Sequence, residues 1–495
     1  MKFLTELYKL GFLNPMRLLK LYKAKKLHGK NTCFLLQYGA AFYKNKTAIT
    51  DGEQSLSFAE MYKLVIKLSS IIRQQTENKK EATAVLVCNN SIQHILLLFA
   101  IQNTGLKLVL INDKNHQNDI LSIISMQKNS CLVFASESKM LPVEDLICIE
   151  ELFNYKEEKQ IAFKPSQKTA AVIFSTSGTT GASKLIEKKE GAFYWLRSFT
   201  DLVTYTGIYK QNSVFIAVPV SHGFGYTALM FSLALGKKAI VAENKDWNQK
   251  ADIIIQEKGE LIAGVPASLF YLAEKLKGKN HQVGLIISGG APLNQLTLNC
   301  IAQSFGKNIF SMYGSTETST SFVANYAQLQ TNICALGKPL KTVKYKLQVI
   351  SGDRNELLIK SGLTNIKSDS GWIHTGDLVI KDEKGLLIWC GRKDDMIIKN
   401  GVNIYPVEIE KHLLSMAEIE DAFVTKEKHS VKGEIIIAFV KLFSGVSVSV
   451  EEINTRLRQV MASIKVPDRI EIVSEFQYTP SGKKIKPDLK GGLPQ

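Results

Sequence analysis

Strand-like apolar runs alternate with longer helix-like segments through most of the chain. Residues 83–87 form a run rich in Val, residues 92–105 have a helix-like pattern, and residues 108–111 form the next run. Comparable runs follow at residues 214–218, 238–242 and 284–287. Strands separated by helices favour parallel pairing, because parallel strands need a long crossover. The rhythm over residues 47–378 therefore predicts an α/β fold of layered sheets and helices.

The pattern changes near residue 340, where the apolar runs become short and lie between turns. Runs of this kind lie at residues 345–349, 356–359 and 386–389 and indicate a smaller β unit. After residue 395, helix-like residues 407–414 and 450–461 flank a strand-like run at 435–440. This mixture predicts a compact α+β domain at the end of the chain.

At 495 residues the chain is too long for one ordinary core, so two or more domains are expected. No run approaches the roughly 18 apolar residues of a membrane span. Glu6 and Lys9 interrupt the apolar residues of the N-terminus, unlike the core of a signal peptide. Seven scattered cysteines, without a CxxC pair, disfavour a disulfide framework or a zinc site. These features predict a cytoplasmic protein with reduced thiols.

Nearly half of the formal charge of +16 lies at the N-terminus. Residues 1–30 hold eight basic residues and one acidic residue, a net charge of +7, and their apolar residues recur at near-helical spacing. Two short basic amphipathic helices are expected, separated at Asn14 and Pro15. They either lie on an anionic lipid surface, at the inner face of a membrane, or pack on the main domain with their lysines in solvent. No basic and aromatic interleaving of an RNA-binding kind occurs elsewhere, so no nucleic-acid partner is expected.

A segment rich in hydroxyls and glycines follows the strand-like residues 171–174. Glycines let the backbone aim N–H groups at an anion, and hydroxyls and a lysine add donors. The spacing is not that of a P-loop, because Ser183 precedes Lys184 and Leu185 follows it. By composition alone the segment is either a phosphate-binding loop or a flexible surface loop. The candidate phosphate-binding residues are Thr176, Ser177, Gly178, Thr179, Thr180, Gly181 and Lys184.

Six further motifs follow in order along the chain. They are PVSHGFG at 219–225, SGGAPL at 288–293, YGSTE at 313–317, WIHTGD at 372–377, GRKDD at 391–395 and PSGK at 480–483. With the segment at 175–184, they resemble the ordered signatures of the AMP-forming adenylating enzymes, the superfamily of acyl-CoA synthetases, firefly luciferase and peptide-synthetase adenylation domains. The resemblance spans roughly residues 35–490 and is closest to bacterial fatty acyl-CoA synthetases.

The resemblance implies a large N-terminal domain and a small, mobile C-terminal domain. We expect a basic segment over residues 1–30, an adenylating domain over 31–390, a hinge over 391–395 and the mobile domain over 396–495. In the family the C-terminal domain rotates about the residue that matches Asp394. Small and polar residues suit such a hinge.

An acid is activated in this family because a carboxylate is a poor electrophile, whereas AMP leaves readily from an acyl-adenylate. The transition state gathers negative charge, so the site needs a cation, Mg²⁺ and oriented donors. The resemblance implies that the loop from Thr176 to Gly181 and Lys184 hold the β- and γ-phosphates and that Glu317 helps to hold Mg²⁺. ATP, Mg²⁺ and CoA are the expected cofactors and co-substrates.

Other residues are expected to hold the nucleotide. The backbone could approach adenine closely at Gly289, Gly290 and Ala291. Tyr313 would offer its flat ring to adenine, and it is the first residue of the motif that continues with Gly314, Ser315 and Thr316. Asp377 corresponds to the aspartate that grips the ribose hydroxyls, and Arg392 would contact ribose or phosphate. By composition alone each of these residues could instead be ordinary turn, core or surface.

Lys483 matches the mobile catalytic lysine, which reaches the substrate carboxylate and the α-phosphate during adenylation. Lys484 and Lys486 are close competitors, and the glycine before Lys483 decides the assignment. Residues 399–406 resemble the loop that rotation brings beside the pantetheine arm, with Gly401 allowing close approach.

The acid is expected to be uncharged apart from its carboxylate. Residues 222–231 match the acyl-pocket region and lack the aspartate with which amino-acid-activating domains bind an ammonium group. His222 either gates the carboxylate or is a packing histidine. No carrier domain follows Lys483, so we expect the acceptor in trans.

The main expectation is a fatty acyl-CoA synthetase of lipid metabolism. Aryl-acid ligation, as by o-succinylbenzoate–CoA ligase, and loading of a separate carrier protein are the alternatives. A non-catalytic relative that senses acyl groups or nucleotide is a hypothesis of another class. Retention of Lys184, Glu317, Asp377, Arg392 and Lys483 speaks against it.

Overall fold

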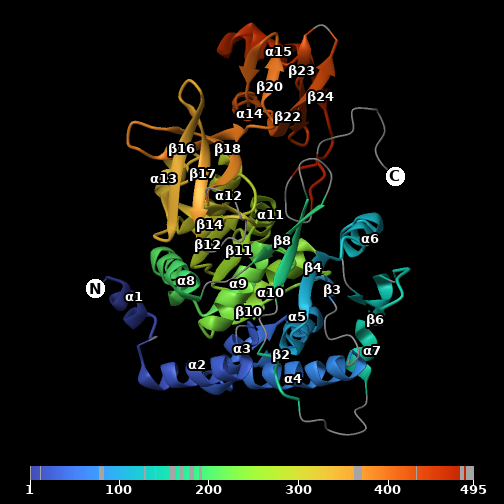
Figure 1. The fold of residues 1–495 in the computed structure, drawn as a ribbon. Helices are drawn as coiled ribbons and strands as arrows, with labels where there is room; N and C mark the ends of the chain where they lie inside the picture. Colours follow the sequence, from blue (N-terminus) through green and yellow to red (C-terminus); the bar gives the residue numbers. More distant parts are fainter. Residues whose placement is uncertain are drawn as a thin grey trace. The chain divides into compact units, whose positions relative to one another are not determined.

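The computed structural model divides into two compact units (Figure 1). It describes residues 2–11, 13–29, 31–76, 83–127, 130–139, 141–155, 163–167, 171–177, 183–188, 192–361, 371–430, 432–479 and 484–485. The first unit holds residues 1–327, 339–343 and 361–367, and the second holds residues 328–338, 344–360 and 368–495. None of the helices in these described stretches is long and apolar enough to cross a bilayer.

Four helices open the first unit, namely α1 (Lys2–Lys9), α2 (Pro15–His28), α3 (Cys33–Phe42) and α4 (Phe58–Gln75). The side chain of Asn14 accepts hydrogen bonds from the first turn of α2, and Pro15 starts that helix, so the expected break between two basic helices is confirmed. His28 anchors the end of α2, because its ring contacts Asn103 Oδ1 at 2.8 Å and Tyr62 Oη at 3.1 Å. The basic segment therefore packs on the first unit.

A six-stranded sheet forms one layer of the first unit. Its strands run in the order β6 (Leu146–Cys148), β5 (Cys131–Ala135), β3 (Thr83–Cys88), β4 (Lys107–Asn112), β7 (Val172–Ser177) and β8 (Ser183–Lys188). The pairs from β6 to β7 are parallel, whereas β8 pairs with β7 antiparallel. The associated helices are α5 (Ile92–Thr104), η1 (Glu137–Lys139), α6 (Gln117–Ser125) and α7 (Ile149–Asn154).

A second, larger sheet runs in the order β14 (Ser319–Asn325), β13 (Ile309–Ser315), β12 (Leu285–Gly289), β11 (Leu261–Gly264), β9 (Ser213–Ile216), β10 (Lys238–Ile240), β1 (Thr47–Thr50) and β2 (Ser55–Ser57). All neighbours from β13 to β1 are parallel. Its helices are α8 (Ala192–Thr206), η2 (Ile208–Lys210), α9 (Gly223–Ala234), α10 (Trp247–Gln256), α11 (Pro266–Leu276) and α12 (Gln295–Phe305). The chain passes from the first unit to the second within α13 (Tyr326–Thr331).

One apolar core joins the two sheets. It contains side chains of β3, β4 and β7 from one sheet and of β9 to β12 from the other, together with α3, α4, α5 and α9. Residues 94–103 of α5 are all buried, which fits a helix whose central residues 95–101 are apolar on every face. The predicted α/β layering is confirmed.

The second unit contains a four-stranded sheet of β16 (Val343–Ser351), β17 (Arg354–Ser361), β18 (Ile373–Lys381) and β19 (Leu387–Arg392). The short β15 (Lys338–Pro339), which comes before them in the chain, pairs with β14 as the edge strand of the larger sheet. A second sheet contains β21 (Val402–Ile404), β20 (Ile397–Lys399), β23 (Gly433–Leu442), β22 (Ile419–His429) and β24 (Arg469–Ile472), with helices α14 (Pro406–Leu413), η3 (Ser463–Lys465) and α15 (Val450–Val460). The large and small α/β parts of the expected fold class are thus present.

The division of the chain differs from the expected boundary at residues 391–395, because residues 344–360 and the strands β18 and β19 belong to the second unit. Contacts of the small sheet explain the difference. Arg354 of β17 forms an ion pair with Glu408 of α14, and its guanidinium lies 3.9 Å from the ring centroid of Tyr405. The hinge and the mobility of residues 396–495 remain proposals.

Candidate active site

Strands β13, β12, β11 and β9 are parallel neighbours, so their carboxyl ends lie at one edge of the large sheet. β9 leads toward His222, the N-cap residue of α9. β12 ends at Gly289 and leads into Gly290 and Ala291, and β13 ends just before Thr316 and Glu317. Ligands of open α/β sheets bind at this edge. Three of the predicted motifs are therefore brought together.

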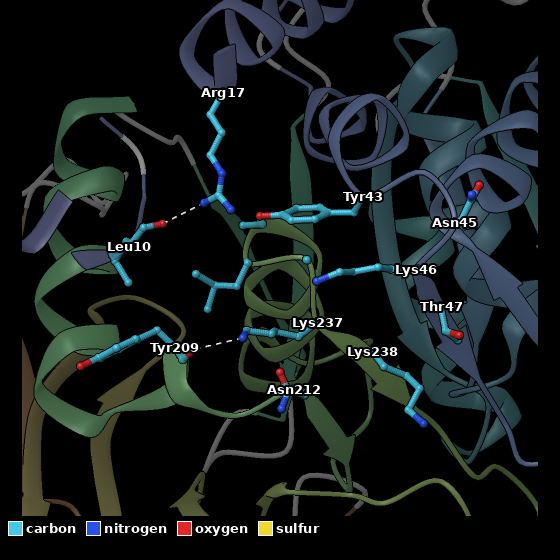
Figure 2. Close-up of a pocket in the computed structure, with 13 residues that line it drawn as sticks. Leu10, Arg17, Tyr43, Asn45, Lys46, Thr47, Tyr209, Asn212, Lys237 and Lys238 are labelled. Atoms are coloured by element: carbon cyan, nitrogen blue, oxygen red, sulfur yellow. Dashed lines mark hydrogen bonds between the residues drawn. The ribbon is translucent and has the colours of Figure 1, made fainter. Parts of the chain in front are cut away.

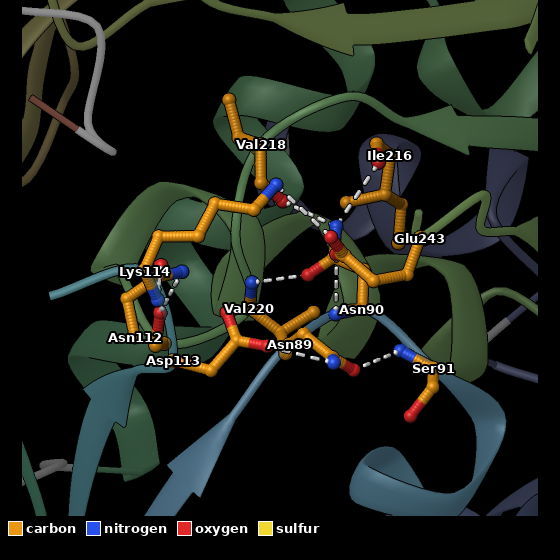
Figure 3. Close-up of polar contacts among 11 residues, drawn as sticks. Asn89, Asn90, Ser91, Asn112, Asp113, Lys114, Ile216, Val218, Val220 and Glu243 are labelled. Atoms are coloured by element: carbon orange, nitrogen blue, oxygen red, sulfur yellow. Dashed lines mark hydrogen bonds and ion pairs between the residues drawn. The ribbon is translucent and has the colours of Figure 1, made fainter. Parts of the chain in front are cut away.

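Asn90, two residues beyond β3, clamps the end of β9 (Figure 3). Its Nδ2 donates to the carbonyl oxygens of Ile216 at 3.3 Å and Val218 at 2.8 Å, and its Oδ1 accepts from the backbone N–H of Val220 at 2.8 Å. Its own backbone N–H donates to Glu243 Oε2 at 3.0 Å. A buried amide with this many partners fixes the path of the chain toward His222.

A second asparagine holds the residue before His222. Asn112, the last residue of β4, donates from Nδ2 to Ser221 Oγ at 3.2 Å and accepts from the backbone N–H of Lys114 at 2.9 Å. Lys114 also forms an ion pair with Glu243 at 3.0 Å (Figure 3). Polar contacts from the six-stranded sheet thus position the predicted acyl-pocket motif on the larger sheet.

Glycines at two positions let this motif pack closely. A Cβ on Gly225 would lie 2.2 Å from the carbonyl oxygen of Pro219, so no larger residue fits in the first turn of α9. A Cβ on Gly289 would meet the ring of Phe224 at 3.3 Å. Phe224 therefore lies against the end of β12, where the predicted adenine-binding turn begins.

The turn between β13 and β14 is tight and carries Glu317. Ser315 and Thr318 bond each other through backbone N–H and hydroxyl groups, at 3.0 and 3.2 Å. A Cβ on Gly314 would lie 2.0 Å from the carbonyl oxygen of Ser319, which explains the glycine. Just before it, the ring of Tyr313 meets that of Phe322 edge-on, with centroids 6.0 Å apart.

Glu317 is a suitable Mg²⁺ ligand. Its side chain is half-exposed. Within the described residues, no group of three or more His, Cys, Asp or Glu could form a metal cage. Mg²⁺ commonly takes one or two carboxylates and fills its remaining positions with phosphate oxygens and water. The donor set fits a magnesium ion that arrives with a nucleotide.

The predicted phosphate loop lies between paired strands. Thr176 and Ser177 end β7, and they pair in register with Lys184 and Ser183 of β8. Since β7 is parallel to β4, the loop starts at the same edge as Asn112. The intervening Gly178, Thr179, Thr180 and Gly181 lie outside the described residues.

The second unit brings Asp377 and Arg392 together. They are register partners on β18 and β19. Trp389 Nε1 donates to Asp377 Oδ1 at 3.2 Å, and Arg392 Nη2 donates to the carbonyl oxygen of Thr375 at 3.3 Å. Arg392 Nε is buried and has no hydrogen-bond partner among the described residues. An oriented carboxylate beside a guanidinium with a spare donor fits a ribose and its phosphate.

Two carboxylates shape the surroundings of this pair. Glu356 is 3% exposed and accepts from His374 Nδ1 at 3.2 Å and from the backbone N–H of Gly376 at 3.4 Å. It thereby braces the turn before Asp377. Burial raises the pKa of Asp395, and the positive charge of Arg392 opposes that rise.

Gly401 lies in a two-residue hairpin turn between β20 and β21. Asn400 has φ of 49° and Gly401 has φ of 77°, so both are left-handed, as in the commonest Asn-Gly hairpin turns. A Cβ on Gly401 would meet nothing within 4 Å. The turn is therefore open to an approaching ligand.

Lys483 lies outside the described residues, but its competitor Lys484 is described. Lys484 Nζ donates to Asp421 Oδ1 at 2.5 Å and to the carbonyl oxygen of Ala422 at 2.7 Å. Tyr478 forms a β-bridge with Lys484 and donates from its hydroxyl to Asp421 Oδ2 at 3.0 Å. Lys484 is tethered within the second unit, which disfavours it as the mobile lysine. Lys486 also lies outside the described residues.

Sequence reasoning missed four residues that position the site, namely Asn90, Asn112, Glu356 and Trp389. The signal for the asparagines was present, because each follows an apolar strand directly or nearly so. No comparable signal marks Glu356 or Trp389, because their partners lie on neighbouring strands whose register the sequence does not give.

The α/β fold and the order of the motifs are those expected of an enzyme that activates an acid with a nucleotide. A family model described as AMP-binding enzyme matches residues 36–357, and one described as AMP-binding enzyme C-terminal domain matches residues 408–483. The chain belongs to the AMP-binding, adenylate-forming enzymes, as its motifs predicted.

Curated relatives align along nearly the whole chain. The 2-succinylbenzoate–CoA ligase of Bacillus pumilus is 27% identical over 469 residues, which cover 90% of this chain and 95% of the relative. The ligase of the same name from Lactococcus lactis is 28% identical over 468 residues, covering 92% and 99%.

Solved structures share the fold. The o-succinylbenzoate CoA synthetase of Bacillus subtilis with its acyl-adenylate has a TM-score of 0.79 at 23% identity, covering 93% of this chain and 98% of that one. ATP-bound MatB of Rhodopseudomonas palustris has a TM-score of 0.76 at 20% identity, covering 92% and 97%. A further structure of the Bacillus subtilis enzyme contains ATP and a magnesium ion.

Proposed function

We propose that this enzyme uses ATP to convert an aromatic carboxylic acid to its acyl-adenylate and then transfers the acyl group to the thiol of CoA. o-Succinylbenzoate is the first candidate acid. The observation that carries this proposal is the alignment of 2-succinylbenzoate–CoA ligases along 90% or more of the chain. The fatty-acid substrate and the role in lipid metabolism expected from the sequence have no support from these relatives, which favour the aryl alternative.

The chemistry proceeds in two displacements. A carboxylate oxygen attacks the α-phosphorus of ATP, and pyrophosphate leaves with the bonding electron pair. The thiolate sulfur of CoA then attacks the acyl carbon, and AMP leaves. Mg²⁺ would neutralise phosphate charge in the first step.

Each assigned residue has a proposed role in one of these two steps. Glu317 would hold Mg²⁺, while Thr176 to Gly181 and Lys184 would hold the phosphates. Asp377 would orient the ribose, and Arg392 would donate to ribose or phosphate through its unused Nε. Lys483 would reduce the repulsion between the acid and the α-phosphate, and Gly401 would meet the pantetheine arm.

The face of α9 that is only half-buried fits an uncharged ring. Gly223, Phe224, Thr227, Ala228 and Phe231 share this face, and none of them is charged. Phe231 stacks edge-on against the buried Phe199, with centroids 4.7 Å apart. o-Succinylbenzoate keeps a second carboxylate after activation, whereas the one hydroxyl on this face, that of Thr227, already donates to the carbonyl oxygen of Gly223 at 2.6 Å. An assay should therefore compare aromatic acids that have one carboxylate with aromatic acids that have two.

The test is pyrophosphate release with ATP and Mg²⁺ across o-succinylbenzoate, benzoate and a series of fatty acids, each with and without CoA. We expect an aromatic acid to give the highest rate and CoA to increase it. A maximum at one aliphatic chain length would return the assignment to a fatty acyl-CoA synthetase. A rate of pyrophosphate release that does not change when CoA is added would indicate a carrier-protein acceptor. No pyrophosphate release with any acid would favour a non-catalytic relative.

We also propose that the exposed face of α2 touches an anionic membrane surface. Met16, Leu18, Leu19 and Tyr22 are between 47% and 65% exposed, and the exposed Lys23, Lys25 and Lys26 follow them along the helix. Apolar side chains beside lysines complement acyl chains beside anionic headgroups. The opposite face is occupied, because Ala24 and His28 are buried in the first unit.

Point variants test this contact better than deletion of residues 1–30, which would uncover the core around His28. Leu18→Ser, Leu19→Ser and Tyr22→Ser together should lower sedimentation with phosphatidylglycerol vesicles. The control pair Tyr271→Ser and Leu296→Ser alters exposed apolar residues elsewhere and should have no effect. Equal sedimentation of all three proteins would refute the membrane contact.

A further inference from the structure

A cavity of about 550 Å³ lies at the amino ends of β1, β9 and β10 (Figure 2). Asn45 to Thr47, Asn212 and Lys237 to Lys238 contribute to its wall, and each segment comes immediately before or begins one of these parallel strands. The assigned acid and nucleotide residues of this sheet lie at the carboxyl ends. The cavity is therefore separate from the candidate active site.

Three cations reach into this space from different elements. Figure 2 shows Arg17 of α2, Lys46 before β1 and Lys237 before β10 directed into it, whereas Lys238 points away. Lys238 is neutralised by Glu257 at 2.8 Å. No acidic residue lines the cavity, and none of the three inward cations has an ion-pair partner among the described residues.

The three cations are held in place by neutral groups. Arg17 Nη1 donates to the carbonyl oxygen of Leu10 at 3.0 Å, and its guanidinium lies 5.7 Å from the ring centroid of Tyr43. Lys46 Nζ lies 5.5 Å from the same centroid. Lys237 Nζ donates to the carbonyl oxygen of Tyr209 at 2.9 Å. Carbonyls and an aromatic face orient positive charge without cancelling it.

Like charges gathered in this way repel one another. Burial lowers the pKa of Lys237, and the charges of Lys46 and Arg17 lower it further, while Glu260 opposes them. Glu260 does not line the cavity, and its carboxylate is bound to a wall residue, accepting from the backbone N–H of Asn212 at 2.7 Å and from its Nδ2 at 3.1 Å. A bound anion would relieve the repulsion that Glu260 offsets only in part.

We propose that this cavity binds a ligand through a phosphate group. Two lysines and an arginine match the charge and the several acceptor oxygens of phosphate. The amides of Asn45 and Asn212 and the hydroxyl of Thr47 line the same wall, while Leu10, Tyr43 and Leu235 supply apolar surface for the rest of the ligand. The volume lies within the range of small-molecule sites. The phosphate belongs either to a soluble metabolite or to a lipid headgroup.

Equilibrium dialysis with labelled inorganic phosphate tests the site. Lys46→Gln combined with Lys237→Gln should weaken one class of phosphate binding by about tenfold or more, since hydrogen bonds to charged groups contribute roughly 1.5–3 kcal/mol. Binding at the active site should be common to both proteins, because the changed residues lie at the other end of the strands. The control pair Lys210→Gln and Lys275→Gln removes two exposed lysines outside the lining and should leave binding unchanged.

Vesicles distinguish the two sources of phosphate. If phosphatidylglycerol vesicles bind the wild type more tightly than the Lys46 and Lys237 double variant, and inorganic phosphate competes, the source is a headgroup. If the wild type and the double variant differ in phosphate binding by dialysis but bind vesicles equally, the source is a soluble molecule. Identical phosphate binding by the wild type and the double variant would overturn the proposal. Lys46→Glu, at an exposed position, provides the same comparison if the double variant fails to fold.

Discussion

Trp389 donates its indole N–H to Asp377 Oδ1 at 3.2 Å across neighbouring strands of the small sheet. Asp377 is thereby oriented by a rigid side chain whose one donor is used in this bond. The residue assigned to nucleotide recognition depends on a neighbour that no motif contains. This dependence can be separated from catalysis by experiment.

Replacing Trp389 with Phe should raise the KM for ATP about threefold to tenfold and leave kcat nearly unchanged. The reason is that one net hydrogen bond, about 1 kcal/mol, no longer orients the ribose acceptor. Asp377→Ala should raise the KM much further. Steady-state pyrophosphate release measures both, and Trp247→Phe, which alters a tryptophan that stacks on Tyr271 and belongs to none of the motifs, is the control. A fall in kcat alone for Trp389→Phe would contradict the positioning role.

Asn90→Ala should destabilise the protein by about 3 kcal/mol. The change leaves the carbonyl oxygens of Ile216 and Val218 and the N–H of Val220 without their side-chain partner in a buried place. Urea denaturation measures the loss. Asn299→Ala on the exposed surface of α12 should cost less than about 0.5 kcal/mol. Equal costs at the two positions would show that the clamp does not stabilise the fold.

Lys484 and Lys483 should behave differently although they are adjacent. Lys484→Gln should lower stability, because Asp421 loses its cation and the carbonyl oxygen of Ala422 loses its donor. Lys483→Ala should leave stability unchanged and slow adenylation by about 100-fold or more. Thermal unfolding and single-turnover pyrophosphate release measure the two effects. With a synthetic acyl-adenylate, Lys483→Ala should still transfer the acyl group to CoA.

The opposite pattern, with adenylation lost in the Lys484 variant and spared in the Lys483 variant, would exchange the two assignments. ATP binding by Lys483→Ala serves as the internal control, because the proposed role requires binding to survive.

Glu410 should make stability fall as the pH rises toward neutrality. Burial raises the pKa of this carboxyl from 4.5 to about 7, against the lowering effect of Lys484. Between these values the folded state keeps a proton that the unfolded chain has lost, so stability declines through that window, by about 3 kcal/mol in all. Glu410→Gln removes the decline while keeping an acceptor for Val424 N–H, which Glu410 Oε1 binds at 2.8 Å.

The Glu410 variant should therefore match the wild type near pH 4.5 and exceed it in stability at pH 8. Urea denaturation across this range, with the exposed Glu451→Gln as control, provides the measurement. A stability difference that does not change with pH would mean that Glu410 ionises normally in the folded protein.

The α/β layering and the positions of most strands could be predicted because they depend on local patterns. The run at residues 83–87 is β3, and the run at 284–287 is nearly β12. The gathering of His222, Gly290 and Glu317 at one edge follows from parallel pairing. The clamp at Asn90 could not be predicted, because its partner Val220 lies 130 residues away. Which sheets meet, and in what register, depends on packing that one sequence does not reveal.

The substrate could be predicted only in part for the same reason. The absence of an aspartate over residues 222–231 argued against substrates that carry an ammonium group, and it said little about any other acid. The sequence of α9 does not show which of its faces is half-buried, because that depends on which face packs against the core. Likewise, Arg17 and Lys237 became neighbours of one cavity only through the fold.

The left-handed pair Asn400 and Gly401 has a consequence for binding. Its two residues already occupy the conformations that an Asn-Gly hairpin prefers, so the tip is ordered before any ligand arrives. A ligand that meets Gly401 loses little affinity to the ordering of a loop, unlike a ligand that must first organise a disordered one. Binding at this tip therefore depends on how accurately the ligand and the tip approach each other, and very little on folding of the tip.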